Sequence, residues 1–259
     1  MKKILIAFIA LVVILWGPWI VFSSASLQFI IEDSFYSERI HLEITGLEKG
    51  LFYTLSAEKV IIRGPGGELL VFDSVRSRID PLSLMMLKLR LTAAGNIGGG
   101  TFSGNLRLGK GAGQMLFDVK QADISQIPLL QKIGVQGTGT ISGRVSLMYD
   151  SVTIVFATEK VSFEPSLVAG IKLPLNFFHR ATGSLTAKDN IITIESVSLE
   201  GKDVFARLKG RIQNSLTDMT MELMPGRTVI ENPLFLAEFE RYKVSPGYYA
   251  IPVRGNLSL

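Results

Sequence analysis

Few residues in this chain could carry out catalysis or bind a metal. It has no cysteine and only two histidines, His41 and His179. The missing cysteines exclude disulfides, thiolate catalysis, cysteine-ligated zinc and iron–sulfur clusters. Neither histidine has a second metal-binding side chain at a ligand spacing, and we expect each to lie on a solvated strand or loop. The sequence therefore predicts a protein that is not an enzyme and that holds no metal or cofactor.

One segment has the spacing of a phosphate-binding loop. Residues 104–110 read GNLRLGK, but Gly111 stands where a serine or threonine would bind magnesium. The intervening residues alternate between apolar and polar, as in a strand, whereas a phosphate-binding loop leads into a helix. The chain has no G-x-S-x-G sequence and no acidic calcium loop. We expect a strand that ends in a Gly-Lys-Gly turn.

The charge balance argues against nucleic acid as a partner. The 259 residues include 27 lysines and arginines against 23 acidic residues, a net charge of +4. Neutralising a phosphate backbone requires a concentrated basic surface, which this composition does not indicate.

The N-terminus has the pattern of a membrane anchor. Residues 4–22 carry no charge, Lys2 and Lys3 precede them, and Trp16 and Trp19 lie near the far end, where indoles favour the interface. We predict that residues 1–25 form a cytoplasmic tip and a transmembrane helix, and that residues 26–259 form a β-domain outside the cytoplasm. A cleaved signal peptide ending near Ala25 is the alternative, although its apolar core is usually shorter.

After residue 26 the apolar pattern has a period of two. Apolar residues alternate with polar ones in four segments, 102–108, 141–147, 204–212 and 219–223, and turn sequences at 64–67, 109–111, 188–190 and 201–203 punctuate the chain. Helices are expected only at 80–87, with Asp80 as cap, and at 124–133, with Asp123 as cap. Strands without long intervening helices predict a mainly β fold, an elongated and curved antiparallel sheet with one or two short helices.

Two segments of the β-domain are similar to each other. Residues 100–108 and 139–147 both read G-T-apolar-S-G-polar-apolar-polar-L, and residues 181–185 are a looser copy. One interpretation is that unrelated hairpins share a common pattern. The other is a repeating meander in which glycine begins a strand where the backbone bends or bulges.

Such a sheet has a large apolar face that requires a cover, and the expected helices are too short to supply all of it. The alternating sets are therefore candidates for a lipid-binding groove, with ordinary core as the alternative interpretation. The candidate residues are Val145, Leu147, Val204, Leu208 and Ile212.

The order of these features resembles the AsmA-like proteins. The sequence Asp80-Pro81-Leu82-Ser83-Leu84 is similar to the P-L-S-L helix start of that class. Residues 123–130, DISQIPLL, followed by 137–143, GTGTISG, are similar to its D-L-x-x-L-P-x-L and glycine-rich unit. The length and the single anchor most resemble the type II secretion system protein N family.

The resemblance implies an AsmA-like groove or half-barrel facing the periplasm of a Gram-negative bacterium, held at the inner membrane by the single N-terminal helix. It implies a non-enzymatic component of the type II protein secretion system, whose partners are other secretion proteins. The alternative is an AsmA-like envelope protein that binds or transfers phospholipid in an apolar β-groove. The resemblance supplies no catalytic residues.

Overall fold

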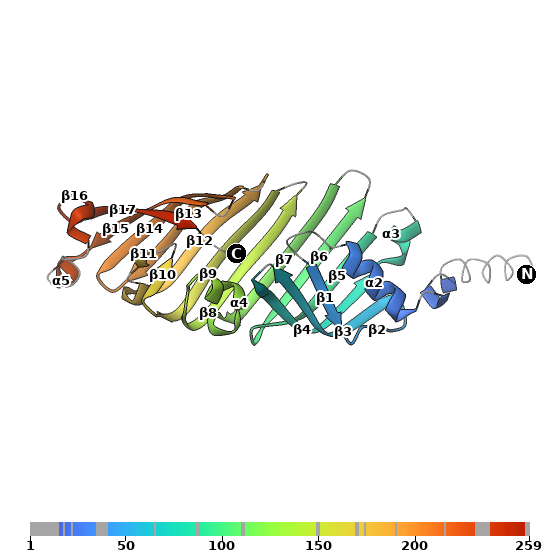
Figure 1. Cartoon of the computed structure of the whole chain (residues 1–259). Coiled ribbons are helices and arrows are strands. Elements are labelled where there is room, and N and C mark those ends of the chain that lie inside the picture. The colour runs from blue at the N-terminus through green and yellow to red at the C-terminus, as the bar shows by residue number, and fades with distance from the viewer. Residues whose placement is uncertain are drawn as a thin grey trace, which may run out of the picture.

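The computed structural model is a mainly β protein. It describes residues 16–17, 19–21, 23–34, 41–64, 66–85, 89–109, 112–148, 151–168, 171–173, 175–189, 191–214, 216–230 and 239–256. Fifteen strands form one antiparallel sheet, and β10 pairs with β11 in a separate hairpin. Figure 1 shows the large sheet as an elongated, twisted surface, blue at one end and red at the other.

The strands follow one another across the sheet almost in chain order, as expected for an antiparallel meander. The order is β1-β3-β4-β5-β6-β7-β8-β9-β12-β13-β14-β15-β17-β16, and β2 pairs with β3 outside this path. The first strands are β1 (His41–Thr45), β2 (Glu48–Lys49), β3 (Thr54–Gly64), β4 (Gly67–Ile79), β5 (Leu89–Ile97), β6 (Gly100–Gly109) and β7 (Ala112–Asp123). The remaining strands are β8 (Gly137–Met148), β9 (Ser151–Phe163), β10 (Ser166–Val168), β11 (Ile171–Leu173), β12 (Phe178–Lys188), β13 (Ile191–Gly201), β14 (Val204–Gln213), β15 (Leu216–Pro225), β16 (Lys243–Ser245) and β17 (Tyr248–Asn256).

The alternating sequence pattern gives the sheet one apolar and one polar face, as predicted for the segments around 102–108, 141–147, 204–212 and 219–223. On β14, Val204 and Ala206 are buried, whereas Arg207 and Lys209 are exposed. All the predicted turn sequences lie between consecutive strands, for example residues 201–203 between β13 and β14.

Short helices cover parts of the apolar face. Helix α2 (Ser24–Ser34) places Leu27 and Ile31, one turn apart, against the cluster of Trp19, Tyr53 and Leu55. Helix α4 (Pro128–Lys132) and the residues around it cover the centre of the sheet, where Ile127 packs with Phe102 and Ala122. In Figure 1, α2 and α4 lie on the same side of the sheet. Helix α2 was not among the helices predicted from the sequence.

The apolar face of the last strands forms the largest core cluster. The cover comes from β11, the 3-10 helix η2 (Leu175–Phe177), helix α5 (Arg227–Ile230) and Phe239, which precedes the 3-10 helix η3 (Glu240–Tyr242). Beneath this cover, Ala206, Leu223 and Val253 have no solvent-exposed surface. Burial of this extent makes the C-terminal half of the sheet a conventional hydrophobic core.

The two predicted short helices form, and the second is divided. Asp80 caps α3 (Pro81–Met85) by accepting the Leu82 N–H at 3.1 Å. Residues 124–133 split into the 3-10 helix η1 (Ile124–Gln126) and α4, because Pro128 has no N–H and holds Ile127 extended. Asp123 caps η1 as predicted. The Ser125 hydroxyl, at 2.7 Å, and its backbone N–H, at 2.9 Å, lower the pKa of the Asp123 carboxyl.

The repeated glycines occupy equivalent places in the sheet, which favours the interpretation of the repeats as a meander. The first glycines, Gly100 and Gly139, each lie against a neighbouring strand where it bulges, at Gln121 and Lys160, whose φ angles are +53° and +52°. The second glycines, Gly104 and Gly143, pair with Phe117 and Phe156, and Gly183 of the third copy also pairs with Phe156. Glycine thus leaves space for a bulge at the first position and for an aromatic ring at the second.

We predict that Gly100→Ala lowers the free energy of unfolding by about 2–3 kcal/mol, a cost typical of overpacking. A Cβ at this position would lie 2.4 Å from the Lys120 carbonyl oxygen and 2.5 Å from the Ala122 nitrogen. These are backbone atoms, so no rotamer change relieves the clash. Urea unfolding measures the effect, with Gly66→Ala as the control because only the tip of Lys132 approaches that position. Equal stability of the two variants would refute the proposed role of Gly100.

Most of the predicted membrane anchor, including Lys2 and Lys3, lies outside the described residues. In the part of the chain that the structure describes, no helix is both long enough and apolar enough to cross a membrane. Trp19 is buried, its indole N–H donates to the Gly50 carbonyl at 3.1 Å, and its ring lies 4.8 Å from that of Tyr53. Trp16 lies 5.2 Å from Phe52. Both indoles therefore contact the β2–β3 loop, and their position at a membrane interface stays a prediction.

Candidate functional site

The residues considered first for chemistry lie far apart and on the surface. His41 begins β1 and His179 lies on β12, and both side chains are exposed. Among the described residues, no group of histidine and carboxylate side chains has the arrangement of a metal site. The 104–110 segment lies within β6 up to Gly109, so it is a strand and lacks the loop geometry of a nucleotide site.

The most extended candidate site is an apolar row that runs across eight neighbouring strands. Cross-strand pairing places one residue of each strand at the same level, on the face that carries α2 and α4. We call this set the open row, and its members are Leu91, Leu106, Met115, Leu147, Val152, Ala187, Ile192 and Ile212. With strands about 4.8 Å apart, the row is roughly 34 Å long.

The open row is half-buried along its whole length. It lies at the sheet margin formed by the β6–β7, β8–β9, β12–β13 and β14–β15 turns, which are short. The long connections that carry α4, the β10–β11 hairpin and α5 all leave from the opposite margin. Two covering elements lie near the Leu91 end of the open row: α3 connects β4 to β5 at this margin, and α2 packs on the cluster that Ile79, the partner of Leu91, also contacts. Within the described residues, the rest of the cover lies toward the opposite margin, and the members of the open row stay half-buried.

Burial increases away from the open row and toward the C-terminal strands. In the next row of pairs, Val145 and Ile154 are half-buried, whereas Ile194, Met219 and Val253 are 8%, 3% and 0% exposed. The apolar face thus changes from an accessible surface at β5–β9 to a closed core at β14–β17. An apolar ligand has access only to the first part.

All five sequence-predicted groove residues lie on the apolar face, but they differ in their surroundings. Leu147 and Ile212 belong to the open row, and Val145 lies one pair further in. Leu208 and Ile212 both pack against the large C-terminal core cluster, and Val204 is 7% exposed within it. Only Val145 and Leu147 are therefore placed away from that cluster, where a ligand could reach them without unfolding the sheet, and lipid binding by either residue stays a prediction.

Five members of the open row were not identified from the sequence, namely Leu91, Met115, Val152, Ala187 and Ile192. Leu106 was noted in an alternating strand but was not assigned to a site. Alternation identifies which residues face the core, whereas membership of a row depends on register between strands. Bulges between Val119 and Ala122 and between Ile194 and Val197 shift that register, and no local pattern indicated them.

The row has the chemistry of a surface for hydrocarbon. Its members have no side-chain hydrogen-bonding group, so it favours an apolar ligand without fixing that ligand's orientation. Each methylene removed from water there contributes about 0.8 kcal/mol, so part of one acyl chain suffices for measurable binding.

The free edges of the sheet are a second candidate site. At the C-terminal edge, β16 pairs with β17 only at Tyr248 and Tyr249, so residues 250–256 have a strand neighbour on one side only within the described part of the chain. Pro252 lies in this segment and lacks an N–H, a feature that limits strand addition at exposed edges.

Comparison of the chain with protein-family models, with curated proteins and with solved structures gives no match.

Proposed function

We propose that this protein is a non-enzymatic, membrane-anchored envelope protein that shelters lipid acyl chains on the open row of its β-sheet. The observation that carries the proposal is the open row itself, eight half-buried apolar residues at one level of the sheet. Soluble proteins generally cover a continuous apolar surface of this length, and an uncovered one marks a binding site. On this proposal the half-open sheet corresponds to the AsmA-like groove.

Apolar side chains near the predicted anchor support a location at the membrane. Ile20, Val21, Leu51 and Phe52 are 69%, 82%, 71% and 61% exposed. The Lys49 ammonium donates to the Trp19 carbonyl at 2.5 Å, which holds the β2–β3 loop beside the chain that leaves the anchor. Exposed apolar groups of this kind are stable where they enter the lipid interface. The N-terminal end of the sheet would then face the inner membrane, with the remainder in the periplasm.

Site-specific photo-crosslinking in the full-length chain tests lipid binding apart from the anchor. A photoreactive amino acid replaces Leu106 or Leu147 on the apolar face, and Ser146 on the opposite face serves as the matched control. After irradiation in cells, mass spectrometry detects lipid adducts on the tryptic peptide that carries the probe. We expect phospholipid adducts at residues 106 and 147 and at most a tenth of that yield at residue 146. Equal yields at all three positions, or none at any, would overturn the proposal.

A component of the type II secretion system is the second candidate, and the partly unpaired edge of β17 favours it. An exposed edge strand accepts a strand from a partner, and secretion machines assemble from several periplasmic proteins. The two functions are compatible, because the edge and the open row are different surfaces. Photoreactive probes at Ala250 and Arg254 are expected to crosslink to secretion proteins, and normal secretion in a deletion strain would contradict this role.

A further inference from the structure

Four arginines lie together on the polar face of the sheet. Arg76 and Arg78 are on β4, Arg90 is on β5 and Arg107 is on β6, and all four are exposed. Arg90 pairs directly with Arg107, which places their Cα atoms about 5 Å apart. Arg78 pairs with Thr92, two residues from Arg90 on the same strand and face. Like charges directly opposite each other destabilise a sheet, so this arrangement lowers stability unless an anion binds there.

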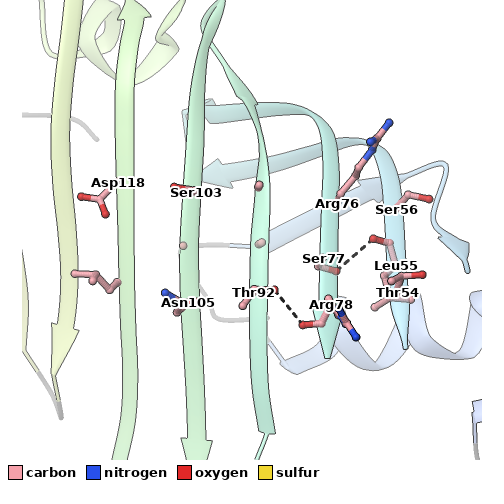
Figure 2. Close-up of a pocket in the computed structure, with 14 residues that line it drawn as sticks. Thr54, Leu55, Ser56, Arg76, Ser77, Arg78, Thr92, Ser103, Asn105 and Asp118 are labelled. Atoms are coloured by element: carbon pink, nitrogen blue, oxygen red, sulfur yellow. Dashed lines mark hydrogen bonds between the residues drawn. The ribbon is translucent and has the colours of Figure 1, made fainter. Parts of the chain in front are cut away.

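The arginines line two adjoining hollows. The larger hollow, of about 650 Å³, includes Arg76 and Arg78 (Figure 2), and the smaller, of about 330 Å³, includes Arg78, Arg90 and Arg107. Arg78, Thr92 and Asn105 belong to both hollows. The surface is therefore concave where the charge is concentrated, and the hydroxyl and amide groups between the arginines add neutral hydrogen-bond donors.

The charge of this site is not neutralised by the protein. The two hollows contain four arginines and two aspartates, Asp80 and Asp118. The Arg144 Nε lies 2.7 Å from an Asp118 oxygen, and an Asp80 oxygen accepts the Leu82 N–H at 3.1 Å. Across the described ranges, none of the four arginines forms an ion pair.

Several basic residues elsewhere on the sheet form ion pairs with carboxylates, unlike the four arginines. Arg63 pairs with Glu43 and with Glu68. Lys209 pairs with Glu222, and this contact lowers the pKa of the Glu222 carboxyl.

We infer that Arg76, Arg78, Arg90 and Arg107 form a binding site for a phosphate-bearing anion, either a phospholipid headgroup or a free phosphate ester. Guanidinium groups bind phosphate oxygens through paired N–H donors, and four of them around two adjoining hollows concentrate positive charge where such an anion would bind. The site lies on the face opposite the open row, so it does not depend on acyl-chain binding there. It also differs from a phosphate-binding loop, because its donors are side chains on strands.

Binding to the full-length chain in phosphatidylcholine nanodiscs tests this inference. The probes are inorganic phosphate and dihexanoyl phosphatidylglycerol, with dihexanoyl phosphatidylcholine as the zwitterionic comparison, and isothermal titration calorimetry measures each affinity. The variant is R90Q/R107Q. The matched control is R207Q/R211Q, which removes two charges from the same face outside both hollows. Circular dichroism and the unfolding midpoint check the fold of each variant.

We expect saturable binding of a phosphate probe that weakens at least ten-fold in R90Q/R107Q and less than two-fold in the control. The unfolding midpoint of R90Q/R107Q should equal or exceed that of the unchanged protein, because the repulsion between positions 90 and 107 is removed. Binding of phosphatidylglycerol alone identifies a lipid headgroup, and equal binding of inorganic phosphate identifies a free ester. Absence of saturable binding, or equal losses in the variant and the control, would overturn the inference.

Discussion

Leu147→Asp is expected to abolish acyl-chain binding while the β-sheet stays folded. Leu147 is half-buried at the centre of the open row, between Met115 and Val152. A leucine side chain buried against a ligand contributes about 1.5–3 kcal/mol, which corresponds to roughly a 10- to 100-fold change in affinity. A carboxylate in the same place also resists removal from water, so the loss is expected at the upper end of this range.

The fold is expected to tolerate this change because the carboxylate at position 147 retains access to water. We expect a loss of about 1 kcal/mol in the free energy of unfolding, typical of a half-buried position. Ser146→Asp is the matched control, with the same charge on the adjacent residue and the opposite face. Displacement of a fluorescent fatty-acid probe and urea unfolding measure the two quantities. If Leu147→Asp prevents folding, the open row is part of the core and the proposed function fails.

The general architecture was predictable because two-residue alternation is a local property. It identified the strands that became β6, β8, β14 and β15, and the turn sequences marked where they reverse. Both short helix caps, at Asp80 and Asp123, were also predictable, because an aspartate immediately before a helical segment is a local signal. Helix α2 was missed because its eleven residues, SASLQFIIEDS, follow the apolar segment and show too little polar contrast to indicate an amphipathic helix.

The candidate sites were less predictable because both depend on register between strands. Val145 and Leu147 were identified as apolar-face residues, but their sequence does not show that Leu91 and Ile192 lie at the level of Leu147. The arginine site also depends on the register between strands. Arg90 and Arg107 are distant in the sequence and become opposite partners only in the β5–β6 pair. Counting charges along the sequence does not reveal that Arg90 and Arg107 are cross-strand partners. The small net charge of the chain also gives no indication of a concentrated basic site.

Leu223→Asp is expected to unfold the C-terminal half of the sheet and spare the N-terminal half. Leu223 has no exposed surface and lies on β15 between Ala206 and Tyr249. The change removes about 1.5–3 kcal/mol of apolar burial and places a carboxylate where no water reaches it, which costs several kcal/mol more. The total loss approaches the entire free energy of unfolding of a typical domain, which is about 5–15 kcal/mol.

Unfolding should stay local because each strand of this meander contacts mainly its neighbours, as in a repeat protein. Among the described residues, the large C-terminal cluster and the cluster around Phe102 share two partly buried residues, Leu130 and Ile141. Hydrogen exchange measured by mass spectrometry should therefore show loss of amide protection in β12–β17 and retention in β3–β7. Met224→Asp is the matched control, since the adjacent side chain is 37% exposed on the other face. Equal loss of protection along the whole chain would show instead that the sheet folds as a single cooperative unit.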